Sequence, residues 1–266
     1  MNPGNHRKPF AVITGASRGI GATYARALAQ RGFDLLLVSR DASRLHALAT
    51  TLQNTNGVEV ETAVLDLAQP DAGHQLFVLS RQKREHVDLV INNAGFGMYG
   101  PFVDMPLPRI HEMLRLHVNT VVDSTRLFLP SMIERKAGAI INVASLAGFF
   151  PIPYLSEYAA TKAFMISFSE ALAEEVRPLG VYIQTCCPGY TDTDFHQTAG
   201  VKSPSPLLKP QTSDQVVQTS LRALDRRKVH VTVGWQGRLT DFLSRYFPRT
   251  LLIRRAGKRV KPANHP

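Results

Sequence analysis

Cysteine is almost absent from this chain of 266 residues, and the two that occur, Cys186 and Cys187, are adjacent. Two neighbouring cysteines exclude a disulfide framework, and a bridge between them would be strained. The nine histidines contain no HExxH motif, and His111 and His117 stand six residues apart, on different sides of any helix that carries both. The sequence therefore predicts no structural disulfide and no metal site.

An apolar leader is also missing. Residues 1–9 carry three basic or histidine side chains, and no apolar run follows them. The sequence thus predicts a disordered preamble over residues 1–9, no secretory signal and a cytoplasmic location. Hydrophobic residues make up 44% of the chain, which together with its length favours one large globular domain.

Acidic residues are scarce at the C-terminal end. Residues 1–221 contain 19 Lys and Arg against 19 Asp and Glu, whereas residues 222–266 contain 12 against 2. We expect a basic amphipathic extension over residues 237–266, which either makes peripheral contact with an anionic membrane or acidic partner, or covers the substrate and ends in solvent. These basic residues do not alternate with aromatic residues in a recognised nucleic-acid-binding fold, so no nucleic-acid binding is expected.

Short apolar runs alternate with helical patterns along most of the chain, which is typical of a doubly wound, Rossmann-type parallel α/β sheet. We expect a single catalytic domain over residues 10–236, with a substrate lid near 193–211 after the sixth strand. The expected strands are residues 10–15, 34–40, 58–67, 87–95, 138–145, 181–189 and 228–235, and the expected helices are residues 19–31, 41–54, 70–85, 105–135, 156–177 and 212–226.

A glycine-rich loop joins the first expected strand to the first helix. Gly15, Gly19 and Gly21 would let the backbone turn tightly and approach a pyrophosphate at the helix N-terminus. Their spacing, G-x-x-x-G-x-G, differs from G-x-G-x-x-G, but the strand-to-helix context is the one that dinucleotide binding requires.

The second strand ends at Ser39 and Arg40, where a dinucleotide fold usually carries an acid that binds the adenosine ribose. An acid would repel a 2′-phosphate, whereas Arg40 and Arg18 would donate hydrogen bonds to it. The sequence therefore favours NADP(H) over NAD(H), with Asp41 next door as the contrary feature.

Tyr158 and Lys162 stand four residues apart in an expected helix, so they share one face. Taken alone, such a pair is common on protein surfaces. The alternative is that the ammonium activates the phenol: at roughly 5 Å it would lower the pKa of the phenol by about two units.

Six motifs, in this order and at these separations, resemble the short-chain dehydrogenase/reductase family from about residue 10 to about residue 235. They are "TGASRGIG" at 14–21, "NNAG" at 92–95, Asn119 in "HVNT", Ser145 in "NVAS", "YAATK" at 158–162 and "PGYTDT" at 188–193. The resemblance implies an NADP(H)-dependent oxidoreductase that interconverts a hydrophobic ketone or aldehyde and its alcohol.

The resemblance also implies roles for the catalytic residues. Tyr158 would be the general acid/base, and Lys162 would both activate it and bind the nicotinamide ribose. Ser145 would share the substrate oxygen with Tyr158. Asn119 would bend its helix and hold a water that relays protons from Lys162.

A cofactor-binding set follows from the same motifs. The backbone of residues 92–95 would line the ribose, and the alternative for Asn92 is a structural role in which it pins the central strands. The residues implied to bind NADP(H) are Gly15, Ser17, Arg18, Gly19, Ile20, Gly21, Ser39, Arg40, Asp66, Leu67, Asn93, Ala94, Gly95, Tyr158, Lys162, Pro188, Gly189, Thr191 and Thr193.

The expected substrate cleft is hydrophobic and would suit a hydrophobic small molecule. Its expected lining is Phe96, Met98, Tyr99, Phe149, Phe150, Ile152, Tyr154, Leu155 and Tyr190. By resemblance the helices at 105–135 and 156–177 would form the interface of a homodimer or homotetramer. The alternative function is a non-catalytic NADP(H) sensor or scaffold that uses the basic end to bind a partner.

Overall fold

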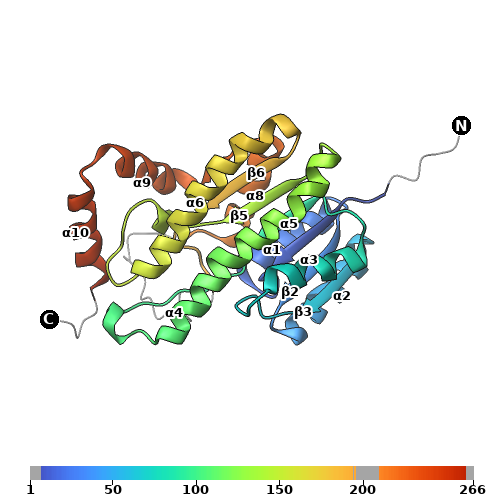
Figure 1. The fold of residues 1–266 in the computed structure, drawn as a ribbon, viewed down its shortest axis with the longest axis horizontal. Helices are drawn as coiled ribbons and strands as arrows, with labels where there is room; N and C mark the ends of the chain where they lie inside the picture. The colour runs from blue at the N-terminus through green and yellow to red at the C-terminus, as the bar shows by residue number, and fades with distance from the viewer. Residues whose placement is uncertain (1–6, 194, 196–209, 262–266) are drawn as a thin grey trace, which may run out of the picture.

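A seven-stranded, fully parallel sheet forms the centre of the protein (Figure 1). The computed structural model describes residues 7–193, 195 and 210–261. The strands lie in the order β3-β2-β1-β4-β5-β6-β7, so the expected doubly wound Rossmann-type fold is confirmed. Their bounds are β1 Phe10–Thr14, β2 Asp34–Ser39, β3 Val60–Val64, β4 Leu89–Asn92, β5 Ala139–Val143, β6 Tyr182–Cys187 and β7 His230–Thr232.

The central strands are buried on both faces because helices cover both sides of the sheet. Side chains alternate between the faces, so Ala11 and Ile13 enter one core while Phe10 and Val12 enter the other. The first core is closed by α1 Gly19–Gln30, α2 Ala42–Asn56 and α8 Ser213–Asp225, and the second by α3 Ala72–Lys83, α5 Thr120–Glu134 and α6 Ser156–Val176.

The long helix expected over residues 105–135 is interrupted. The helix α4, Leu107–Leu114, passes into a π-helical turn, η2, at Arg115–Asn119, and α5 continues from there. A π-turn inserts an extra residue into the helix and so changes which side chains face the sheet. Short 3₁₀ turns also occur at η1 Phe102–Asp104, η3 Leu146–Gly148 and η4 Arg177–Leu179.

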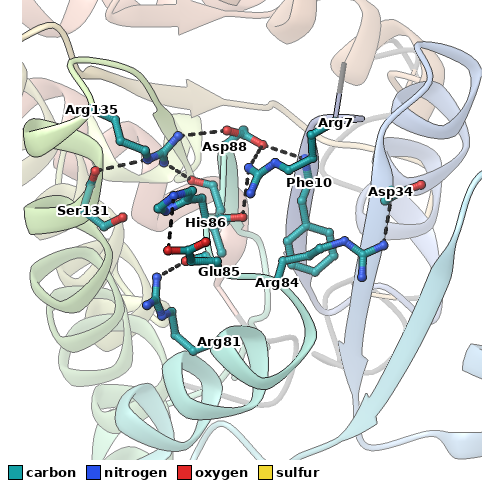
Figure 2. Close-up of polar contacts among 11 residues, drawn as sticks. Arg7, Phe10, Asp34, Arg81, Arg84, Glu85, His86, Asp88, Ser131 and Arg135 are labelled. Atoms are coloured by element: carbon teal, nitrogen blue, oxygen red, sulfur yellow. Dashed lines mark hydrogen bonds and ion pairs between the residues drawn. The ribbon is translucent and has the colours of Figure 1, made fainter. Parts of the chain in front are cut away.

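Charged side chains tie the strands together at the amino-terminal edge of the sheet, away from the carboxyl ends where ligands bind in such folds (Figure 2). Asp88, which precedes β4, accepts hydrogen bonds from the backbone N–H of Phe10 at 2.8 Å, from Arg7 at 3.0 Å and from Arg135 at 3.1 Å. Arg84 pairs with Asp34 at 3.2 Å, and its guanidinium lies over the ring of Phe10. These contacts fix the starts of β1 and β4 and the end of α5.

Two helices complete the chain after β7: α9 spans Gly234–Tyr246 and α10 spans Arg249–Val260. Figure 1 shows them at one end of the molecule, far from α2 and β3. Within the described residues, no helix is both long and apolar enough to cross a bilayer. The expected lid near 193–211 lies mostly outside the described residues.

Candidate active site

A cavity of about 780 Å³ opens at the carboxyl ends of the strands. Of the catalytic and cofactor-binding residues implied by sequence, only Gly21 and Asn119 are not among those that line it. The lining includes Gly15, Ser17, Arg18, Gly19, Ile20, Ser39, Arg40, Asp66, Leu67, Asn93, Ala94, Gly95, Ser145, Tyr158, Lys162, Pro188, Gly189, Thr191 and Thr193.

The glycine loop has no room for larger side chains. Gly15 has a φ of 65°, and a Cβ there would lie 2.9 Å from the Cα of Ala94. A Cβ on Gly21 would lie 2.2 Å from the carbonyl oxygen of Gly15, so Gly21 packs the start of α1 against the loop rather than lining the cavity. The loop therefore exposes its backbone and the N-terminus of α1 to the cavity, a cradle that fits the pyrophosphate of a dinucleotide.

Three arginines, Arg18, Arg40 and Arg44, line the cavity beside the end of β2. Asp41 caps α2: its carboxylate accepts from the backbone N–H of Arg44 at 3.0 Å and pairs with the Nε of Arg44 at 3.3 Å. The Ser39 hydroxyl accepts from the backbone N–H of Asp41 at 3.1 Å. The carboxylate of Asp41 is thus engaged by α2, and the residues present fit a phosphorylated ribose. Sequence reasoning missed Arg44.

Asparagines hold the strand ends in place. Asn92 donates to the Oδ1 of Asn142 at 2.8 Å and accepts from Ser124 at 3.0 Å, all of them buried, so Asn92 pins β4 to β5 and α5. Asn93 donates to the carbonyl oxygen of Thr14 at 2.8 Å, and the Thr14 hydroxyl accepts from the backbone N–H of Asn93 at 2.9 Å. These bonds lock the glycine loop after β1 to the NNAG segment after β4.

Tyr158 and Ser145 meet at the reacting end of the cavity. Burial raises the pKa of Tyr158 to about 12, and a hydrogen bond with Ser145 acts in the opposite direction. The Ser145 hydroxyl also accepts from the backbone N–H of Ala147 at 3.1 Å, which fixes it directly after β5. The expectation of a lowered phenol pKa was wrong for these residues, because it considered the charge of Lys162 and left out the cost of burying a phenolate.

Lys162 is buried beneath the tyrosine, with 4% of its surface exposed. Its Nζ lies 5.7 Å from the centroid of the Tyr158 ring and donates to the carbonyl oxygen of Val143 at 2.8 Å. Burial lowers the pKa of Lys162 to about 8. The side chains of Tyr158 and Lys162 therefore lie together, as expected from their spacing.

His117, in the η2 turn, is fully buried behind the site, with its ring centroid 5.9 Å from that of Tyr158. Its Nε2 accepts from the backbone N–H of Phe96 at 3.1 Å, so Nδ1 holds the proton and donates to the hydroxyl of Thr161 at 2.9 Å. That hydroxyl in turn donates to the carbonyl oxygen of Tyr158 at 2.8 Å. Burial, reinforced by the charge of Lys162, holds the pKa of His117 well below its usual value, so the ring is neutral.

Asn119 is exposed two positions later in η2. The helix is interrupted at this position, as expected, and the expected role of Asn119 in holding a water stays a prediction. Sequence reasoning missed His117, which it weighed only as a metal ligand. Across the described part of the chain, no cluster of His, Cys, Asp and Glu side chains is suited to a metal ion.

Gln211 is a third residue that sequence reasoning missed. Its Oε1 accepts from the backbone N–H of Gly189 at 3.0 Å, and its Nε2 donates to the carbonyl oxygen of Val233 at 2.7 Å. This side chain thus fastens the Pro188–Gly189 turn to the segment after β7. No local sequence signal marks it, since its partners are distant in the chain.

Few of the residues expected in the substrate cleft line the cavity. Phe96 does so, with Leu116, Phe195 and Arg109, whose guanidinium lies 4.4 Å from the Phe96 ring. Phe149 instead stacks on His230, with ring centroids 5.4 Å apart. The other expected residues, Met98, Tyr99, Phe150, Ile152, Tyr154, Leu155 and Tyr190, are not among the cavity lining.

Comparison with known proteins gives consistent matches. The profile of a family described as short chain dehydrogenase matches residues 9–204. The very-long-chain 3-oxoacyl-CoA reductase of Macaca fascicularis is 31% identical over 236 residues, which are 85% of this chain and 73% of the relative.

Two solved structures extend the match over almost the whole chain. A short-chain dehydrogenase from Sphingobium yanoikuyae, in complex with NADPH, is 33% identical with a TM-score of 0.81, covering 97% of this chain and 98% of that one. The bulky-bulky ketone specific alcohol dehydrogenase from Comamonas testosteroni is 28% identical with a TM-score of 0.76, covering 97% and 96%.

Proposed function

The chain belongs to the short-chain dehydrogenase/reductase family and is an oxidoreductase acting on CH–OH and C=O groups, and we propose that it uses NADP(H) to reduce a hydrophobic ketone or aldehyde, with Tyr158 as the proton donor. The observation that carries this proposal is that Tyr158, Ser145 and Lys162 line one cavity, with the Nζ of Lys162 lying 5.7 Å from the Tyr158 ring centroid.

Tyr158 holds its proton at neutral pH, since burial raises its pKa to about 12. A protonated phenol is the form that can donate to a carbonyl oxygen as that oxygen becomes an alcohol. NADPH held by the glycine loop and Lys162 would supply a hydride to the carbonyl carbon, and Tyr158 would donate its proton to the carbonyl oxygen to complete the alcohol.

Ser145 and Lys162 support the proton donor. The Ser145 hydroxyl, fixed after β5, donates to the same substrate oxygen and stabilises the negative charge that develops there. The ammonium of Lys162 lies under the Tyr158 ring and stabilises the phenolate left after proton transfer. His117 holds the backbone of Tyr158 in place through Thr161.

The preference for NADP(H) rests on Arg18, Arg40 and Arg44 around the end of β2. Asp41 also lines the cavity there, with its carboxylate paired to Arg44. Guanidinium groups bind a 2′-phosphate through charge-assisted hydrogen bonds. The NADPH complex of the Sphingobium yanoikuyae relative supports the same preference.

The proposed substrate class, a bulky hydrophobic carbonyl compound, is supported by Phe96, Leu116 and Phe195 at the cavity. It is also supported by the similarity to a 3-oxoacyl-CoA reductase and to a bulky-bulky ketone specific alcohol dehydrogenase. A 3-oxoacyl thioester is one member of this class. Arg109, which lies beside Phe96 and pairs with Glu112, is the cavity-lining cation for an anionic part of such a substrate.

We propose that the protein forms a homodimer through α5 and α6. On α6 the rings of Phe164 and Phe168 are stacked 5.6 Å apart, and Phe164 is exposed, as expected of an apolar face that a second copy covers. The cytoplasmic location expected from sequence stays a prediction.

The direct test is a screen of wild type and Tyr158→Phe with NADPH and NADH in parallel, against a graded set of ketones, aldehydes and 3-oxoacyl thioesters. We expect NADPH-dependent reduction by the wild type, a loss of at least about 100-fold in kcat for Tyr158→Phe, and NADPH binding by both. Tight NADPH binding with no turnover of any compound would favour the sensor or scaffold, and full activity of Tyr158→Phe would refute the proton-donor role.

A further inference from the structure

The helix α9 presents an apolar stripe to solvent. Trp235, Leu239, Phe242 and Tyr246 are 70%, 46%, 54% and 71% exposed. They are spaced at three and four residues, so they lie on one face of the helix, and the rings of Phe242 and Tyr246 are 4.7 Å apart. A helix on the surface of a soluble protein normally turns such a stripe inward.

The opposite face of α9 is the one that packs on the domain. Gly237 is buried there, and a Cβ on it would lie 3.2 Å from Thr232 in β7 and 3.6 Å from Leu146, the residue after Ser145. The apolar stripe is therefore not the face by which α9 packs on the domain, because the opposite face of α9 makes that contact.

The helix α10 exposes a basic face. Arg254, Arg255, Lys258 and Arg259 are all exposed and lie at helical spacing. The other side of α10 is anchored: a Cβ on Gly257 would lie only 3.0 Å from Pro153, and the hydroxyl of Tyr99 donates to the carbonyl oxygen of Val260. The two helices are thus held to the same end of the molecule (Figure 1).

The charge of this region selects among possible occupants. Residues 234–261 contain eight Lys and Arg against one acid, Asp241, and that carboxylate pairs with Arg245 at 2.8 Å. A second copy of the chain would bring an equally basic surface against this one, and like charges repel. An uncharged apolar partner would leave the cations of α10 without counterions.

We propose that Trp235, Leu239, Phe242 and Tyr246 of α9, together with Arg254, Arg255, Lys258 and Arg259 of α10, form a docking surface for an anionic lipid bilayer. We call these eight residues the α9–α10 surface. Aromatic and leucine side chains enter the boundary between headgroups and acyl chains, while arginine and lysine bind the anionic headgroups.

Tryptophan fluorescence reports on this surface alone, because Trp235 is the only tryptophan of the chain. The full-length protein is titrated with vesicles of phosphatidylcholine alone or of phosphatidylcholine and phosphatidylserine, and tryptophan emission is recorded. We expect a blue shift with the anionic vesicles, quenching by lipids brominated on their acyl chains, and reversal at high salt.

Variants separate the two parts of the surface. Removing two charges in Arg254→Gln/Arg255→Gln should weaken partitioning about 30-fold, and Phe242→Ser should weaken it without changing the salt dependence. The matched control is Arg81→Gln/Lys83→Gln, which removes two charges from α3 and should leave partitioning unchanged. Turnover of a water-soluble substrate should be unaffected in all three, because none of these residues lines the cavity.

Three results would overturn the proposal. The first is no change in Trp235 emission with anionic vesicles. The second is an equal change with phosphatidylcholine alone, which would remove the role of the basic face. The third is a blue shift that depends on protein concentration without lipid, which would identify a second copy as the occupant.

Discussion

Replacing Lys162 by methionine should stabilise the free protein at neutral pH, although it should also impair catalysis. The ammonium of Lys162 is buried, and its pKa falls from the ordinary 10.5 to about 8. That difference corresponds to about 3 kcal/mol by which folding disfavours the charged lysine. Methionine has a similar length and carries no charge, so it avoids this cost.

The pH dependence distinguishes this charge effect from packing. The folded pKa of Lys162 lies below its unfolded value, so between about pH 8 and 10.5 the unfolded chain binds more protons and wild-type stability rises with pH from this residue. The stability advantage of Lys162→Met should therefore be larger at pH 7 than at pH 10, by about 2 to 3 kcal/mol. The lost bond to the carbonyl of Val143 contributes a constant offset at both pH values.

The assay is urea unfolding of both proteins without cofactor at pH 7 and pH 10, followed by circular dichroism. Other groups titrate equally in the two proteins and cancel in the difference. Lys83→Met removes an exposed lysine that pairs with Glu61, and its difference from wild type should change far less with pH. A free-energy difference for Lys162→Met that is the same at both pH values would refute the reasoning.

Three further predictions concern the surroundings of the site. His117→Phe keeps a ring but removes the acceptor of the Phe96 N–H and the donor to the Thr161 hydroxyl, so it should cost about 1–3 kcal/mol in urea unfolding and lower kcat. His117→Gln, which keeps an acceptor, should recover part of both. Arg40→Ala should raise the KM for NADPH by about 10-fold or more and leave that for NADH nearly unchanged, as steady-state kinetics would show, and equal effects on both would contradict the phosphate site. Asp88→Asn keeps an acceptor for Phe10 but loses the charge that binds two half-exposed arginines, so stability should fall by about 1 kcal/mol with kcat unchanged; an altered kcat would mean that this edge of the sheet communicates with the cavity.

The fold could be predicted from sequence because the strands of a parallel sheet with helices on both faces are buried on both sides, and such strands appear in the sequence as short apolar runs. All seven expected strands exist, each inside its expected range, and each ends before the expected carboxyl end, where the chain leaves the sheet to form the site. The glycine loop could also be predicted, because its geometry has no room for a side chain at Gly15 or Gly21 and so requires glycine at both positions.

The site could be predicted only where its geometry is local. Tyr158 and Lys162 are related by one helical turn, and their proximity follows from spacing. Whether His117 or Asn119 faces inward depends on the π-turn at η2, which the packing of α4 and α5 against the sheet and α6 determines. The pKa of Tyr158 likewise depends on burial, which a pair of residues on a helix does not reveal.

Isotope transfer tests the central claim most directly. NADPH labelled with deuterium at C4 of the nicotinamide, in the position that is transferred, is supplied with a carbonyl compound that the protein reduces, and the alcohol is analysed by mass spectrometry. The account predicts one deuterium on the carbinol carbon with wild type, and with Tyr158→Phe at least about 100-fold less labelled product at unchanged NADPH affinity. Unlabelled alcohol from the wild type, or equal labelling rates in the two proteins, would contradict it.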